Sequence, residues 1–486
     1  MAGIGYELKN IFKEGSLSRI VGGITYSSLV TVGPTIMVIV TIVVLYLTLG
    51  LMSVSYTERE LLSSTILYVF IFSLLTTSIF NGVISRYIAD KIYEEKYEDI
   101  LPSFYTGIFL NTLLGSLFGV PFILRVIFVG KVDPMFAFVS YCFFVIMIIT
   151  FYSMIYLSAT KDYKIIALYY AFGMGVAFIS ANLLYRFGFT TIKSILYGVT
   201  LGFLIIAFLE FSYMRKFFKS NSKNYKECLY YFKNHKGICL CNFLYILGIY
   251  IHNFVFWTHP SHIIVAKSYV SMQSYDMASC LAMFTNISTI IIFTVMAETK
   301  FHDKYQKYNE AVIGKKLNDI NRTKKSMFRL LIQQIRYLVA IQALITAIIF
   351  LIAIIILPNL GFGGSVISIY PSLVCAFFTI FLMYCNIIFM FYFNDSKGAM
   401  LTSIVFCISV LVGSIFSIRF TESLYGLGAF FGAFIGWTFS FFRIQYVEKH
   451  FEEHIFCRTT ILNKRVEKMP ESRVYIRKEE ISESGE

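Results

Sequence analysis

Ionisable side chains are rare inside the long apolar stretches of this chain, so the candidates for acid–base chemistry are few. His252 lies within one stretch, Glu210 lies near the end of another, and Asp276 lies at the start of a third. Such groups at membrane depth cost about 2.5–3.5 kcal/mol on insertion scales and are therefore candidates for function. The centres of the stretches hold no Asp, Glu, Lys or Arg, which disfavours a proton-coupled antiporter with a midplane carboxylate.

Uncharged polar side chains offer a second chemistry, which is hydrogen bonding to the hydroxyl groups of a neutral sugar. Asparagines at these depths also tie helices to one another, and the sequence leaves both interpretations open. Gly33-Pro34 interrupts the first stretch, because proline lacks an amide donor and crowds the preceding turn, so this bend could act as a hinge. The residues predicted to line a path for such a substrate are Gly33, Pro34, Asn81, Asn111, Asn182, His252, Asn253, Asp276, Asn286 and Asn386.

Twelve apolar stretches must position these side chains, since about 20 helical residues cross a hydrocarbon core about 30 Å thick. The predicted fold class is an all-α polytopic membrane protein with twelve transmembrane helices in two six-helix lobes. Hydrophobic residues make up 57% of the chain and charged residues 15%, which excludes a water-soluble fold. The predicted spans are residues 29–49, 61–82, 104–123, 135–157, 164–184, 194–213, 238–257, 277–297, 337–357, 367–391, 398–418 and 424–442.

The charges between the stretches predict the orientation of the chain. If the N-terminus is cytoplasmic, all but seven of the 42 Lys and Arg residues fall on the cytoplasmic side. Basic residues collect on that side of membrane proteins, so both termini are predicted to be cytoplasmic. The net charge of +13 is then explained by topology and anionic lipid, and nucleic-acid binding is not predicted.

Four segments are predicted along the chain. Residues 1–215 form the N-terminal lobe, with an amphipathic helix before spans 1 to 6, and residues 216–236 form a basic cytoplasmic linker. Residues 237–446 form the C-terminal lobe, with spans 7 to 12 and a cytoplasmic loop at 298–336, and residues 447–486 form a cytoplasmic tail. The helical pattern of that loop indicates either an interfacial helix on anionic lipid or a partner dock. The residues predicted for partner docking are Lys324, Lys325, Arg329 and Arg336.

Several function classes lack their signature in this sequence. The nine cysteines are scattered, so no metal site is predicted, and no cofactor is predicted either. There is no P-loop or glycine-rich nucleotide fingerprint, and the chain is predicted not to be an enzyme. A polytopic glycosyltransferase would need a carboxylate near an outer membrane face, for which Asp133, Asp276 and Glu422 are the candidates.

Several motifs resemble the PelG family of exopolysaccharide transporters. They are MAGIGYELKNIF at residues 1–12, followed by Gly33-Pro34, then IHNFVFW at 251–257, the Tyr275-Asp276 pair and AETKFHDKYQKYNEAVIGKKL at 297–317. That family is similar to the polysaccharide flippases of the multidrug/oligosaccharidyl-lipid/polysaccharide exporter superfamily, which have twelve helices in two lobes.

The resemblance implies a function and a set of partners. The expected substrate is Pel, a polymer rich in N-acetylgalactosamine, which would cross the bacterial cytoplasmic membrane and support the biofilm matrix. The expected partners are a cytoplasmic glycosyltransferase and membrane proteins that respond to cyclic di-GMP. The family has no catalytic residues to transfer to this chain.

Three other functions remain open at the level of sequence. A flippase for lipid-linked oligosaccharide would favour a cavity rich in Lys and Arg, a drug/cation antiporter would favour a midplane carboxylate, and the spans suggest neither. A membrane scaffold that recruits the glycosyltransferase through its basic loops would need no path for the polymer. Export should then survive a plugged path, for example in Gly33→Trp, and fail when residues 298–336 are replaced.

Overall fold

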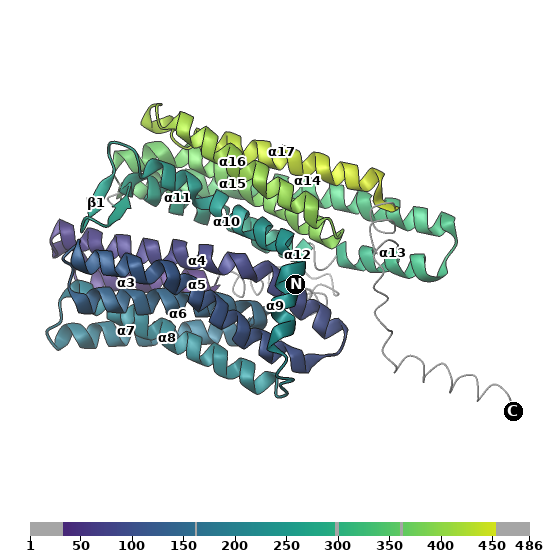
Figure 1. The fold of residues 1–486 in the computed structure, drawn as a ribbon. Helices are drawn as coiled ribbons and strands as arrows, with labels where there is room; N and C mark the ends of the chain where they lie inside the picture. The colour runs from purple at the N-terminus through teal and green to yellow at the C-terminus, as the bar shows by residue number, and fades with distance from the viewer. Residues whose placement is uncertain (1–32, 161–162, 297–300, 360–362, 453–486) are drawn as a thin grey trace, which may run out of the picture.

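The computed structural model describes residues 33–160, 163–296, 301–359 and 363–452. Long helices run nearly parallel to one another and form two groups that lie side by side (Figure 1). The first lobe contains α3 Gly33–Thr48, α4 Tyr56–Tyr93, α5 Ile100–Phe128, α6 Pro134–Thr160, α7 Tyr163–Arg186 and α8 Thr191–Phe217. The second lobe contains α10 Lys236–Phe256, α11 Gln273–Asn286, α12 Ser288–Met296, α14 Leu317–Asn359, α15 Gly364–Tyr392, α16 Ser396–Ser417 and α17 Leu427–Lys449.

Short elements lie in the connections between these helices. They are α9 Tyr225–Asn234, α13 His302–Gly314, β1 Ile263–Val265, β2 Tyr269–Ser271 and three 3-10 turns at Leu51–Ser53, Tyr97–Asp99 and Glu422–Leu424. The two strands form an antiparallel hairpin in which Ile263 pairs with Ser271. We call the end of the molecule with this hairpin the hairpin end, and the opposite end, with α9 and α13, the basic end (Figure 1).

The membrane spans confirm the predicted fold class. Eleven helices in the described part of the chain are long and apolar enough to cross a membrane, and α3 is a shorter apolar helix at the place of the first predicted span. The eighth span is broken at Ile287, between α11 and α12. The ninth starts well before the predicted residue 337, because α14 runs on from Leu317 for 43 residues. At about 64 Å it is twice as long as the hydrocarbon core is thick.

Each lobe has its own apolar core. Phe104 and Phe203 belong to the core of the first lobe, and Phe377 belongs to that of the second. Two residues of α4, Ile71 and Leu75, pack into the core of the second lobe instead of their own. The lobes therefore meet where α4 packs along α10.

Some predicted features lie partly or wholly outside the described residues. The amphipathic helix expected before the first span and the tail beyond residue 452 lie outside them. Gly33 and Pro34 are buried in the first turn of α3, and the part of the span that precedes them lies outside as well. The hinge at Gly33-Pro34 therefore stays a prediction.

Candidate functional site at the contact between the lobes

Aromatic rings from both lobes meet near the hairpin end of α4. The Tyr68 ring of α4 stacks on Trp257, which directly follows α10, with ring centroids 5.0 Å apart and planes within 4°. Phe72, one turn further along α4, stacks on Phe254 at 5.9 Å. Phe122 of α5 also stacks on Tyr68, at 5.6 Å. Aromatic pairs contribute about 0.5–1.5 kcal/mol each beyond their burial, so this cluster, which we call the lobe contact, helps hold the lobes together.

The hairpin of the second lobe is hydrogen-bonded to the first lobe. The Tyr68 hydroxyl donates to the Val270 carbonyl at 2.8 Å and accepts from the Val270 amide at 2.9 Å. Gln273, at the start of α11, donates to the Glu60 carboxylate of α4 at 2.8 Å. Since an isolated two-stranded hairpin is marginally stable, these bonds to α4 position the hairpin across the lobe contact.

Asp276 supports the lobe contact from within the second lobe. Its carboxylate accepts hydrogen bonds from Asn253 Nδ2 at 2.7 Å, Trp257 Nε1 at 3.0 Å and the Met272 amide at 3.1 Å. The residue is 7% exposed, and these three donors are neutral. Asp276 therefore acts as a buried acceptor that fixes the indole of Trp257 against Tyr68.

His252 lies beside this network. Its Nδ1 is 3.0 Å from the Tyr275 hydroxyl, and the Tyr275 ring stacks on Phe256 with centroids 3.9 Å apart. His252 Nε2 is buried without a hydrogen-bond partner in the described part of the chain. Of the residues predicted to line a substrate path, His252, Asn253 and Asp276 are thus the three that the fold brings together.

Two predicted path residues tie helices together inside the second lobe. Asn286 of α11 donates to the Val374 carbonyl of α15 at 3.1 Å and accepts from the Thr346 hydroxyl of α14 at 2.8 Å. Asn386 of α15 donates to the Ser440 hydroxyl of α17 at 2.8 Å. Interhelical hydrogen bonds of this kind are common in membranes, and they account for both side chains without a substrate.

The remaining predicted path residues lie on first-lobe helices. Asn111 and Asn182 each donate at 2.8 Å to a carbonyl one turn earlier in their own helix. Asn81 of α4 has a buried side-chain carbonyl without a hydrogen-bond partner among the described residues. Neither these side chains nor Gly33 and Pro34 join the Asp276 network, so their role in a path stays a prediction.

The three carboxylates considered for glycosyl transfer lie in different elements and differ in their contacts. Asp133 lies 2.9 Å from the Lys193 ammonium, whose hydrogen bond holds the pKa of Asp133 below its usual range. Asp276 is occupied by the three donors described above, and Glu422 begins a 3-10 turn. The described ranges contain no group of three or more His, Cys, Asp or Glu residues that could hold a metal ion.

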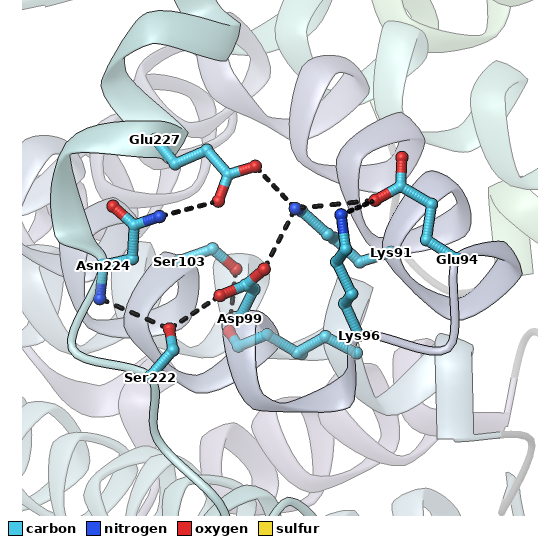
Figure 2. A network of polar contacts seen from close by, with 9 residues as sticks. Lys91, Glu94, Lys96, Asp99, Ser103, Ser222, Asn224 and Glu227 are labelled. Carbon is cyan, nitrogen blue, oxygen red and sulfur yellow. Dashed lines mark hydrogen bonds and ion pairs between the residues drawn. The ribbon is translucent and has the colours of Figure 1, made fainter. Parts of the chain in front are cut away.

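A buried ion cluster at the basic end fastens α9 to the first lobe (Figure 2). The Lys91 ammonium of α4 lies 2.5 Å from Glu227 of α9, 3.0 Å from Asp99 and 3.7 Å from Glu94. Ser222, in the connection before α9, donates to Asp99 at 2.6 Å. We call these residues the Lys91 cluster. It ties the segment that links the two lobes to the ends of α4 and α5.

Three of the four predicted docking residues line one groove at the basic end. Lys325, Arg329 and Arg336 share a face of α14, since they are four and seven residues apart, and with Glu448 of α17 they border a groove of about 510 Å³. Lys324 instead pairs with Glu452 at 3.2 Å. The groove offers concentrated positive charge, and its use by a partner stays a prediction.

Sequence reasoning missed Tyr68, Glu60 and Lys91. Tyr68 is one of 34 tyrosines, and its partner Val270 is 202 residues away, so the sequence does not reveal what the hydroxyl contacts. The spacing of Tyr68 and Phe72, four residues apart on one helix face, was the available signal for an aromatic surface on α4. Lys91 lies among other charged residues beyond the predicted span 61–82, including Arg86 and Asp90, so the sequence did not distinguish it.

Removing the Tyr68 hydroxyl tests how firmly the hairpin is held. Tyr68→Phe is expected to lower the free energy of unfolding by about 1–3 kcal/mol, because the Val270 amide and carbonyl lose a partner in a partly buried place. Thermal unfolding of the purified protein would measure this loss. Tyr97→Phe, at a tyrosine that is 48% exposed, serves as control and should change stability by less than about 0.5 kcal/mol. Equal losses in the two variants would contradict the assigned role.

The fold is that of known membrane transporters. An outward-facing multidrug resistance MATE family transporter of the MOP superfamily is similar at 13% identity and TM-score 0.58, over 92% of this chain and 99% of that one. The inward-facing form of such a transporter matches at 12% identity and TM-score 0.51, over 84% and 99%. A MOP superfamily transporter from Pyrococcus furiosus matches at 13% and 0.58, over 92% and 98%.

Sequence comparison identifies the family more closely than these folds do. No curated protein matches the chain by sequence. The model of the PelG family, described as "Putative exopolysaccharide Exporter (EPS-E)", matches residues 1–456. This match covers nearly all of the 486 residues and includes both lobes. It agrees with a multi-pass membrane protein of two six-helix lobes. The chain therefore belongs to the PelG family.

Proposed function

We propose that this protein exports a Pel-type exopolysaccharide, rich in N-acetylgalactosamine, across the bacterial cytoplasmic membrane for the biofilm matrix. The observation that carries the proposal is the match to an exopolysaccharide exporter family over residues 1–456, together with the two-lobed transporter fold. The basic end is the cytoplasmic end in this proposal, because Lys and Arg collect on that side.

The polymer passes between the lobes, so the lobe contact is the part of the path that must open. Tyr68, Phe72, Phe254 and Trp257 present aromatic faces there, and Asn253 supplies an uncharged polar group. Aromatic rings and neutral hydrogen-bonding groups suit a neutral sugar chain. Each contact is weak, which allows the chain to slide.

The partners in this proposal act at the basic end. A cytoplasmic glycosyltransferase makes the polymer, and membrane proteins that respond to cyclic di-GMP control it. The groove bordered by Lys325, Arg329 and Arg336 is the candidate dock, because its cations would attract an acidic surface of a partner. Replacing these three residues with Gln should reduce recovery of the glycosyltransferase with the transporter while leaving the spans intact.

Deletion of the gene tests the proposal directly. The expected result is loss of the polymer from the cell surface with polymer retained inside the cell, detected with an N-acetylgalactosamine-specific lectin before and after lysis. Return of the intact gene should restore export. Normal surface polymer in the deletion strain would refute the proposal.

A reversible cross-link tests whether the lobes separate during export. Glu60→Cys/Gln273→Cys places thiols at two positions of opposite lobes whose present side chains touch at their tips at 2.8 Å, which is within reach of a short thiol-specific cross-linker that contains a reducible bond. The cross-linker should abolish export and a reductant should restore it, because the bridge would pin α4 to α11. Surface polymer measured under both conditions gives the result.

The matched control places the cross-link inside one lobe. Asp133→Cys/Lys193→Cys replaces a pair whose charged tips are 2.9 Å apart at the hairpin end of the first lobe. The same cross-linker on this variant should leave export unchanged. Full export by the cross-linked Glu60→Cys/Gln273→Cys variant would show that no separation at this place is needed.

A further inference from the structure

Glu210 is a buried carboxylate that accepts no hydrogen bond from the described residues. It lies in α8, is 0% exposed, and neither Oε1 nor Oε2 has a hydrogen-bond partner among the described residues. Buried polar groups are nearly always paired, so an exception calls for an explanation. An ionised carboxylate in this state would be very costly, which means that the structure fits the neutral acid.

The other buried carboxylates in the described ranges are all satisfied. Glu60 accepts from Gln273, and Asp99 accepts from Ser222 and lies beside Lys91. Asp276 has its three neutral donors, and Asp395 pairs with Arg443 at 2.6 Å. Within the described part of the chain, four of the five buried carboxylates thus have partners, and Glu210 has none.

Glu210 also lies within the membrane. It is seven residues from the middle of the span predicted at 194–213, or about 10 Å along the helix axis, where the half-thickness of the hydrocarbon core is about 15 Å. Lipid does not reach it, because the side chain faces the interior of the first lobe. An ionisable group at such a place costs several kcal/mol and is retained where it has a function.

The surroundings of Glu210 are weakly polar. Tyr170 of α7 lies close enough to interact with it electrostatically, and its hydroxyl donates to the sulfur of Met154 at 3.1 Å. On α6, which packs against α8, the Ser153 hydroxyl is buried and also without a hydrogen-bond partner in the described part. Tyr152 and Tyr156 of α6 are bonded to each other and to α5, so their hydroxyls already have partners.

We propose that Glu210 is a proton-binding site through which proton movement is coupled to the transport cycle. In the described state the side chain holds the proton. When the first lobe admits water to α8, the acid transfers its proton to a water molecule, leaving a carboxylate and a hydronium ion. The carboxylate must take up a proton again before the lobe can repack, because the repacked site has no donor for it.

A proton suits this site better than a metal ion. A sodium or calcium ion would need several oxygen ligands around the carboxylate, and none of the described residues supplies a hydrogen-bonding atom to it. Protonation removes the charge of the carboxylate, so the site needs no set of coordinating oxygens. This inference rests on the proposed transport function only for the coupling, and proton binding itself can be measured on the isolated protein.

Infrared spectroscopy of the purified protein in lipid nanodiscs tests the proton site. The wild type should show a protonated carboxylic C=O band, lost at high pH, that is missing from Glu210→Gln and present in Glu210→Asp. Glu310→Gln, which removes an exposed carboxylate, is the matched control and should keep the band. Identical spectra for wild type and Glu210→Gln would overturn the proposal whether or not the protein exports a polymer.

Inside-out vesicles that contain the glycosyltransferase test the coupling. An imposed proton gradient should change polymer translocation by the wild type and have no effect on Glu210→Gln, whose side chain is fixed in the neutral form. Glu310→Gln should respond as the wild type does. A full response of Glu210→Gln to the gradient would overturn the coupling. Absence of translocation in every sample would count against the proposed export function and leave the infrared result to decide on Glu210.

Discussion

Replacing Lys91 with Met should lower the free energy of unfolding by about 3–5 kcal/mol, because removing one partner of a buried ion cluster leaves the others uncompensated. The Lys91 side chain is 7% exposed and Asp99 is 10% exposed, so water replaces little of the lost attraction. Glu227 is 35% exposed and contributes less to the loss. Thermal or denaturant unfolding of the purified protein would measure the effect, and α9 should become accessible to protease.

A neighbouring lysine supplies the control. Lys96 lies 3.0 Å from Glu94, but both side chains are about half exposed, and such pairs contribute less than about 1 kcal/mol. Lys96→Met should therefore leave the melting temperature nearly unchanged. Stability should return when the acids are neutralised together with the lysine, in Lys91→Met/Asp99→Asn/Glu227→Gln. Equal stability of the two single variants would contradict the assigned role of Lys91.

Asp276→Ala should have the second large effect, on stability and on export together. The substitution leaves Asn253 Nδ2, Trp257 Nε1 and the Met272 amide without an acceptor, and each such loss costs about 1–3 kcal/mol. The indole of Trp257 should then leave the face of Tyr68. Unfolding measurements should show a loss of at least about 3 kcal/mol, and surface polymer should fall.

Fluorescence can follow the indole directly. The chain has two tryptophans, so Trp437→Phe leaves Trp257 as the only one. In that background Asp276→Ala should shift the emission of Trp257, whereas Asp133→Ala, at a half-exposed carboxylate of the hairpin end, should not. An unchanged emission after Asp276→Ala would mean that Asp276 does not hold the ring.

The prediction of the fold from sequence was confirmed at the level of helices and lobes. Hydropathy is a sum over about 20 neighbouring residues, so the spans could be predicted without knowing any contact. The errors lie at ends and breaks. Ile287 interrupts the eighth span, and α14 continues far beyond the apolar part of the ninth. Hydropathy predicts neither feature, because it shows where apolar residues lie, and a helix can break inside the membrane or continue beyond it.

The candidate site was predicted only in part. His252, Asn253 and Asp276 were among the ten predicted path residues, and they are neighbours because α10 and α11 lie side by side near the hairpin end. Asn286 and Asn386 were named for the same reason, their polarity inside a span, yet they bond within the second lobe. A polar residue in a span needs a partner in any fold, and the sequence does not reveal which helix provides it.

The sequence by itself determined that the chain lies in a membrane, how many spans it has, on which side its basic loops are predicted to lie, and to which family it belongs. These follow from local composition and from motifs along the chain. Only the tertiary structure decided that Tyr68 meets Trp257, that three carboxylates lie beside Lys91 and that no described residue donates a hydrogen bond to Glu210. Such facts depend on residues far apart in the chain. The energy of a polar group within a membrane is set by the partner that the fold places beside it.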